Sequence, residues 1–285
     1  MREYVIVDVF TDVPLEGNAL AVFLDGEGLS SELMQRAARE LNLSETVFLL
    51  PGDSDSDSDN DGDVRARIFT PAVELPFAGH PVLGTAFVVA ERLGSSLVRV
   101  QTAAGLVPVA LTREGDAIVS GEMEQPIPTW EPLTGSRELL VALGVERSGL
   151  PIEVYSNGSR HTFVELSDAA AVVSLRPDMA ALASVGKLGV SCFTASGPRV
   201  KTRMFGPAIG VPEDPATGSA AGPLAVHLAR HGRIAFGQRI EIRQGAEIGR
   251  PSILEAVADG SPDRIDRVAV GGRAVVVARG EYRLD

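Results

Sequence analysis

Hydrophobic and polar residues alternate along several short stretches of the chain, as they do in half-buried β-strands. Residues 4–26 contain two such stretches around a turn rich in Pro, Gly and Asn, which predicts a hairpin. Further strands are expected in these ranges: 44–50, 64–71, 96–111, 117–123, 151–166, 189–196 and 199–205. The chain has 30 Gly and 18 Pro, and this supply of turn residues also favours a sheet-rich fold.

Four stretches show helical rather than alternating periodicity. They cover residues 30–41, 79–94, 136–144 and 218–232, and Ser30 or Ser31 can cap the first of them. Strands interrupted by a few helices predict an α+β fold.

An internal repeat relates the two halves of the chain. Residues 69–94 parallel residues 205–232, and each copy runs from a strand through a Pro-rich turn into a helix that starts on glycine. We therefore expect two similar domains, residues 1–125 and 126–285, with a cleft between them. The Pro-rich segment 124–135 is the best candidate for the linker, and the last strand can return to the first domain.

The formal net charge of −12 argues against nucleic acid and anionic membranes as partners, because both require a basic surface. No stretch reaches the ~18 apolar residues of a membrane span, and the charged N-terminus does not resemble a signal peptide. The single cysteine, Cys192, suits a reducing compartment, so a cytoplasmic protein is expected.

The two glycines at the predicted helix starts, Gly79 and Gly218, suggest binding of a small anion. A helix N-terminus presents unpaired N–H groups and about half a positive charge, so two such ends could hold a carboxylate without Lys or Arg. The alternative at Gly218 and Ser219 is an ordinary helix cap of the Ser/Thr type.

Three further residues are candidates for acid–base chemistry. Glu45 lies in an apolar run, where burial is expected to raise its pKa toward neutrality, although a solvent-facing residue or a structural ion pair is an alternative. His80 is expected to be neutral near a helix N-terminus, or else to serve only in capping or packing. Asp214 precedes a proline at the edge of the expected cleft and could merely stabilise its own turn.

Other motifs give weaker support for a functional site. His227 and His231 lack the Glu of the H-E-x-x-H zinc motif and have no evident third ligand, so a surface pair near a helix C-terminus is expected and no metal. The acidic segment 53–63 resembles half of a calcium loop, but Ile68 stands where the bidentate Glu is needed, which favours a solvated hairpin tip. No phosphate loop or dinucleotide fingerprint is present, so no nucleotide cofactor is implied.

Several motifs taken together resemble the PhzF family of phenazine-biosynthesis isomerases. They are "NLSETVF", "RIFTPAVELPFAGHPVLGTA", "EDPATGSAAGPLAVHLARHG" and "QGAEIGRPS", and the similarity runs nearly from end to end. The resemblance implies a diaminopimelate-epimerase-like fold, in which each domain is a curved, mostly antiparallel sheet wrapped around a central helix. It also implies a homodimer and no cofactor.

The reaction implied by this resemblance is the isomerisation of trans-2,3-dihydro-3-hydroxyanthranilate, a small anionic cyclic substrate. A proton leaves C3 of the ring and is returned at C1, which yields the aminoketone precursor of phenazines. Glu45 would be the acid/base, His80 and Asp214 would position the substrate and assist proton transfer, and the helix starts at Gly79, Gly218 and Ser219 would contact it.

The chain departs from the family pattern at Ala19, where a proline is usual, and in its acidic 53–63 segment. Two alternatives remain open. One is an isomerase or binding protein for a different small carboxylate. The other is an amino-acid epimerase, whose mechanism needs two cysteines where this chain has one.

Overall fold

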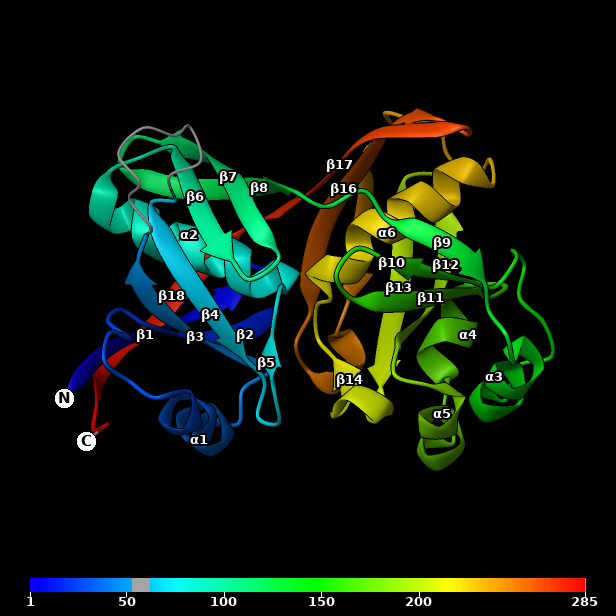
Figure 1. The fold of residues 1–285 in the computed structure, drawn as a ribbon. Coiled ribbons are helices and arrows are strands. Elements are labelled where there is room, and N and C mark those ends of the chain that lie inside the picture. The colour runs from blue at the N-terminus through cyan, green and yellow to red at the C-terminus, as the bar shows by residue number, and fades with distance from the viewer. Residues whose placement is uncertain (53–61, 285) are drawn as a thin grey trace. The chain divides into compact units, whose positions relative to one another are not determined.

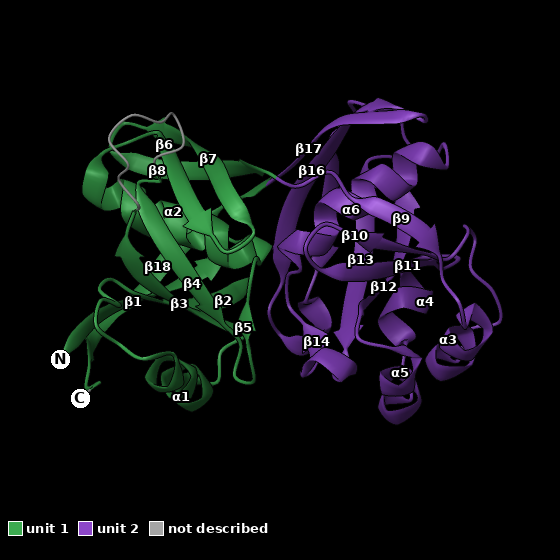
Figure 2. Ribbon diagram, viewed as in Figure 1, with its two compact units in different colours: residues 1–124, 271–285 green, residues 125–270 purple. Residues whose placement is uncertain are grey.

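The computed structural model describes residues 1–52 and 62–284. The chain forms two compact units, the first made of residues 1–124 and 271–285 and the second of residues 125–270 (Figure 2). Most of the acidic segment that was expected to form a hairpin tip lies outside the described residues.

Unit 1 is a sheet with one helix inside it and one outside (Figure 1). Its strands are β1 (Arg2–Val9), β2 (Asn18–Phe23), β3 (Glu45–Pro51), β4 (Val64–Phe69), β5 (Glu74–Leu75), β6 (Leu97–Thr102), β7 (Gly105–Glu114), β8 (Ala117–Glu124) and β18 (Ala274–Tyr282). Its helices are α1 (Ser31–Leu41) and α2 (Gly79–Leu93). The C-terminal strand β18 pairs antiparallel with β1.

Unit 2 has more helices around its sheet. Its strands are β9 (Thr129–Pro132), β10 (Glu153–Ser156), β11 (Arg160–Glu165), β12 (Gly189–Ser196), β13 (Arg199–Gly206), β14 (Val211–Asp214), β15 (Ile240–Gln244), β16 (Ser252–Ser261) and most of β17 (Arg264–Gly272). Its helices are α3 (Ser136–Leu143), α4 (Ala169–Ser174), α5 (Met179–Val185), α6 (Gly218–Arg230) and the short 3₁₀ turns η1 (Pro207–Ile209) and η2 (Ala246–Ile248).

The same series of strand pairings occurs in both units. In unit 1, β2 and β3 are parallel, β3 and β4 antiparallel, β4 and β6 parallel, and β6 and β7 antiparallel. In unit 2, β11 and β12 are parallel, β12 and β13 antiparallel, β13 and β15 parallel, and β15 and β16 antiparallel. Helix α2 follows β5 as α6 follows β14. These pairings confirm the internal repeat and the α+β class.

Helices α2 and α6 form the centre of their units. Residues 79–90 and 218–229 are buried without interruption, because both helices are built of small and apolar residues on every side. Glycine permits the closest approaches. A Cβ at Gly84 would come within 2.7 Å of Val9, and one at Gly222 within 2.5 Å of Val268. The first turns of both helices are therefore held deep within their units.

Two features of unit 2 differ from expectation. Helices α4 and α5 were not anticipated, because each is under two turns long and is fixed by an aspartate cap, Asp168 or Asp178. The segment expected to be a linker contains β9, which pairs antiparallel with β10. None of the described helices is long and apolar enough to cross a membrane.

A buried arginine fixes the strand that carries Asp214. The side chain of Arg203 on β13 is 7% exposed and makes a two-pronged ion pair with Glu213 of β14, at 2.8 Å for each bond. Its remaining N–H groups donate to main-chain carbonyls at the end of α4, including that of Leu175 at 2.9 Å. The charge of Glu213, 12% exposed, is compensated by this one guanidinium.

We expect Arg203→Met to lower the free energy of unfolding by about 3–5 kcal/mol, because it leaves Glu213 with an uncompensated charge. Arg239→Met is the matched control. Its exposed ion pair with Glu255, at 3.3 Å, should contribute less than about 1 kcal/mol. Urea unfolding of both variants measures the difference, and equal losses would contradict the interpretation.

Candidate active site

Glu45 is the first residue of β3 and lies at the edge of the unit 1 core. It pairs with Leu20 in the parallel register of β2 and β3, and the following residues 46–49 are buried. The Glu45 side chain is only 13% exposed. The structure therefore holds this carboxylate in a largely apolar setting, and the solvent-facing alternative is wrong.

His80, the second residue of α2, lies against Glu45. Its Nε2 is 3.3 Å from Oε2 of Glu45, and its Nδ1 is 3.4 Å from the amide nitrogen of Asn18. Because an amide nitrogen can only donate, Nδ1 is the acceptor and Nε2 carries the hydrogen. Complete burial lowers the pKa of His80 to about 3, so the ring is neutral at physiological pH.

Asn18 was missed as a site residue. It is fully buried at the start of β2 and determines which nitrogen of His80 is protonated. In the sequence, Asn18 follows Gly17 in the expected hairpin turn near the N-terminus, and the pattern predicted only the turn.

Neither central helix has a side-chain cap at its N-terminus. Helix α2 is preceded by Ala78, whose methyl side chain cannot accept a hydrogen bond, so no side chain caps its first turn at Gly79 and His80. Helix α6 is preceded by Thr217, but its hydroxyl does not bond to the helix. The alternative of an ordinary Ser/Thr cap is thus not realised. In α6 the N–H groups of Ala220 and Ala221 donate to the carbonyl of Thr217, so those of Gly218 and Ser219 are the ones suited to an anion.

The hydroxyl of Thr217 bonds instead to Asp214, the last residue of β14. Thr217 Oγ1 donates to Asp214 Oδ2 at 2.6 Å and accepts from Gln244 Nε2 at 2.9 Å. The same Gln244 nitrogen lies 2.7 Å from the main-chain oxygen of Asp214. All three side chains are buried, and they fix the Asp214 carboxylate directly before α6.

Gly218 and Ser219 contact three buried side chains that were not expected at the site. Gln125 donates to the carbonyl of Gly218 at 2.9 Å, and Asn157 to that of Ser219 at 2.9 Å. His161 Nε2 lies 3.0 Å from the Ser219 hydroxyl. Asn157 and His161 lie within residues 151–166, for which the sequence predicted only strands.

The candidate residues thus form two groups. Glu45, Gly79 and His80 lie together in unit 1, and Asp214, Gly218 and Ser219 lie together in unit 2.

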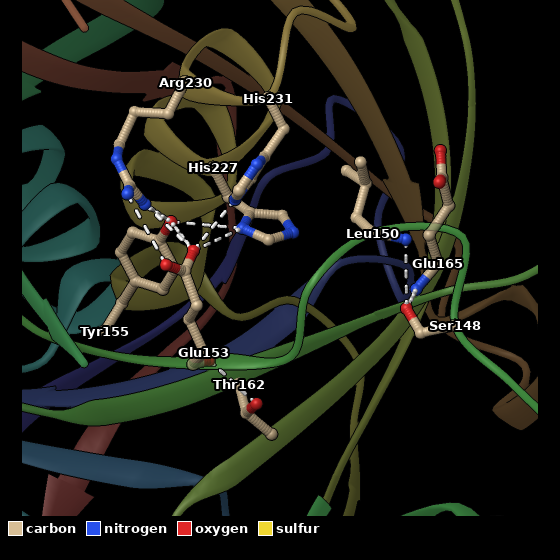
Figure 3. Close-up of polar contacts among 9 residues, drawn as sticks. All are labelled: Ser148, Leu150, Glu153, Tyr155, Thr162, Glu165, His227, Arg230 and His231. Carbon is tan, nitrogen blue, oxygen red and sulfur yellow. Dashed lines mark hydrogen bonds and ion pairs between the residues drawn. The ribbon is translucent and has the colours of Figure 1, made fainter. Parts of the chain in front are cut away.

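A second polar cluster lies at the other end of α6 and corrects the prediction for His227 and His231 (Figure 3). His227 is fully buried rather than a surface residue, because α6 is the central helix. A third potential metal ligand is present, since Glu153 lies with both histidines and all three ligand atoms are within 4.8 Å of one another. His231 Nε2 is 2.9 Å from Glu153 Oε2.

This cluster already holds its own cation. Arg230 Nη1 lies 2.9 Å from Glu153 Oε2, and the hydroxyl of Tyr155 donates to the same oxygen at 2.9 Å. Burial raises the pKa of Glu153, but hydrogen bonds from His227, His231, Arg230 and Tyr155 outweigh it and hold the pKa well below its usual range. A metal ion would have to displace the guanidinium, so we interpret the cluster as structural.

Comparisons with known proteins agree along the whole chain. The family model PhzC-PhzF, described as phenazine biosynthesis-like protein, matches residues 7–280. Two proteins named trans-2,3-dihydro-3-hydroxyanthranilate isomerase are 51% identical. That of Pseudomonas chlororaphis aligns over 98% of this chain and 99% of its own, and that of Pseudomonas aeruginosa over 100% of both.

Solved structures show the same fold. A phenazine biosynthesis protein of the PhzF family from Bacillus anthracis superposes with a TM-score of 0.84 at 25% identity, covering 99% of both chains. Together with the family match over residues 7–280, this similarity shows that the chain belongs to the PhzC-PhzF family of phenazine biosynthesis-like proteins.

Proposed function

We propose that this protein is a trans-2,3-dihydro-3-hydroxyanthranilate isomerase. The observation that carries the proposal is the Glu45–His80 pair, 3.3 Å apart, in a chain that is 51% identical to proteins of that name. A largely buried carboxylate beside a neutral donor suits a group that must both accept and release a proton.

In this mechanism Glu45 removes the proton from C3 of the ring as a carboxylate. The electrons of the broken C3–H bond form a C3–C4 double bond, the C4–C5 double bond shifts to C5–C6, and the pair of the C6–C1 double bond takes a proton from Glu45 at C1. The product is an enol that tautomerises to the aminoketone, so no atom is gained or lost. The neutral ring of His80 lies beside this carboxylate, with its Nε2 3.3 Å from Oε2 of Glu45.

The residues of unit 2 offer groups suited to binding a small carboxylate. The N–H groups of the first turn of α6 and the Ser219 hydroxyl are suitable donors for its carboxylate. Asp214, whose Oδ2 is held by Thr217 at 2.6 Å, is a suitable acceptor for its amino or hydroxyl group. The first turn of α2, which begins at Gly79, offers N–H donors of the same kind.

Epimerase chemistry through cysteine is disfavoured. Cys192 is the one cysteine in the chain, it is fully buried in β12, and burial raises the pKa of its thiol to about 12. An isomerase acting on a different small carboxylate is the remaining alternative, since the proposed binding groups recognise a carboxylate rather than a whole molecule.

We further propose that the protein is cytoplasmic and acts as a homodimer without a cofactor. The single reduced cysteine supports the compartment, and the resemblance to the family supports the dimer. Light scattering of the purified protein tests the oligomeric state.

Glu45→Gln should fold normally and bind substrate, but lose turnover by more than the ~10²–10⁴-fold of simple acid–base assistance, because no other group takes the C3 proton. The measurement is incubation with dihydrohydroxyanthranilate in heavy water, following substrate loss and deuterium in the product. Glu114→Gln, at an exposed residue of β7, is the control and should match the wild type. Normal turnover by Glu45→Gln would refute the assignment, and a substrate inert to the wild type would favour the different-carboxylate alternative.

The proposed role requires that His80 is neutral when folded, and this determines the pH dependence of stability. Its folded pKa of about 3 is below the ~6.5 of an unfolded histidine, so between these values only the unfolded chain binds the proton. The contribution of this group to stability is complete above pH ~6.5 and falls as the pH falls. From pH 7 to pH 5 the wild type should therefore lose roughly 2 kcal/mol relative to His80→Gln in urea unfolding. A relative gain would show instead that His80 is a charged partner of Glu45.

A further inference from the structure

Helix α6 contains a proline at a position that affects the proposed binding site. Pro223 lies beyond the first turn and has no N–H. In an α-helix, the N–H of residue 223 would bond to the carbonyl of Ser219, four residues earlier. The sequence of α6 therefore leaves the carbonyl of a proposed substrate-binding residue without its helical donor.

Asn157 supplies the missing donor. Its Nδ2 lies 2.9 Å from the carbonyl oxygen of Ser219 and 3.3 Å from Oε1 of Gln125, whose own amide donates to Gly218. Asn157 is 3% exposed, and its main-chain N–H bonds to the carbonyl of Ser159 at 3.2 Å, which fixes the turn between β10 and β11. A side chain from outside the helix thus takes the place of a helical hydrogen bond.

His161 holds the other polar group of Ser219. Its Nε2 is 3.0 Å from the hydroxyl oxygen, and its Nδ1 has no hydrogen-bond partner among residues 1–52 and 62–284. The ring lies against Gly189 of β12, where an added Cβ would come within 2.8 Å of Nδ1. Burial lowers the pKa of His161 to about 4, so the ring is neutral at physiological pH.

The unpartnered nitrogen identifies the tautomer. Neutral imidazole has one N–H and one bare nitrogen, and a buried N–H without a partner is rarer than a buried acceptor without one. The hydrogen therefore lies on Nε2 and is donated to Ser219 Oγ. Since that oxygen already accepts a hydrogen bond from the ring, the hydroxyl hydrogen of Ser219 remains to be donated elsewhere.

We propose that Asn157 and His161 are positioning residues that clamp Ser219, Asn157 through its carbonyl and His161 through its hydroxyl, so that the hydroxyl acts as a donor to the substrate carboxylate. The inference rests on the proposed function for the identity of the substrate. It adds a basis for specificity, because a hydroxyl fixed as a donor favours an acceptor such as a carboxylate over a group that can only donate.

The role of His161 is tested by a double-mutant cycle on binding. The probe is 2-amino-3-hydroxybenzoate, an aromatic analogue of the substrate, and 2-aminophenol, which lacks the carboxylate, is the comparison ligand, both in isothermal titration calorimetry. Ser219→Ala and His161→Phe should each weaken binding of the carboxylate probe about 10-fold, which is the size of one hydrogen bond to a charged group. The double variant should weaken it no further, His161→Gln should restore most of the affinity, and 2-aminophenol should change less than 2-fold.

Two results would overturn the role of His161. One is independent effects, with the double variant weakened about 100-fold. The other is an equal loss of affinity for both ligands, which would indicate a merely structural effect. Failure of the wild type to bind the carboxylate probe would also overturn it.

The role of Asn157 is tested against Pro223. Asn157→Leu should lower the melting temperature by about 4–8 °C, because a buried carbonyl loses its donor. In a Pro223→Ala background the helix can supply the N–H itself, so the same substitution should cost less than half as much. An equal fall in melting temperature in both backgrounds would show that Asn157 does not replace the missing helical hydrogen bond.

These binding and melting experiments need no turnover. If the wild type fails to convert dihydrohydroxyanthranilate but the Ser219–His161 cycle is coupled, the isomerase assignment fails and the clamp stands. If turnover is normal and the cycle is additive, the isomerase assignment stands and the proposed role of His161 at Ser219 is wrong.

Discussion

A helix that is buried on every side must find partners for the polar groups of its first turn within the protein. Helices α2 and α6 are both subject to this constraint, since residues 79–90 and 218–229 are buried and neither helix has a side-chain cap. Each of the two sets of candidate residues lies at one of these helix starts. In unit 1 the start carries His80 beside Glu45. In unit 2 it carries Ser219 beside His161, and Thr217, directly before the helix, bonds to Asp214.

The two clusters of charged residues and histidines show how the same residue types acquire different roles. Glu153 receives hydrogen bonds from a guanidinium, a phenol and a histidine, so its charge is fully compensated and it stabilises the end of α6. Around Glu45 the neighbour is a neutral histidine whose second nitrogen is occupied by Asn18. The four hydrogen-bonding neighbours of Glu153, Arg230 among them, hold its pKa well below the usual range, so this carboxylate stays charged.

The sequence was sufficient to predict the parts of the molecule that depend on local pattern. Ser30 caps α1 as expected, Gly94 ends α2 in the left-handed conformation, and the repeated strand–turn–helix units appear as matching strand pairings. The α+β class and the family followed from such features. Glu45 and His80 could be named because short motifs contain them, but their contact depends on β3 and α2 meeting in space.

What the sequence could not give are partners that come from distant segments. Asn157, His161 and Gln125 reach the first turn of α6 from β-strand ends and connections more than 30 residues away in the sequence, and only the folded sheet brings them there. Pro223 was visible from the start, yet its consequence depends on which side chain replaces its missing N–H. The prediction of a surface histidine pair failed for the same reason, since burial of His227 depends on the sheet that surrounds α6.

The anionic character of the chain makes this arrangement of neutral donors informative. A protein of net charge −12 that binds an anion needs a local source of positive potential. Lysine or arginine beside Glu45 would provide it, but would also stabilise the carboxylate and weaken it as a base. Helix N–H groups, a fixed serine hydroxyl and neutral histidines donate hydrogen bonds without a full charge, so in the proposed function they can hold an anion without the positive charge that would weaken a carboxylate base.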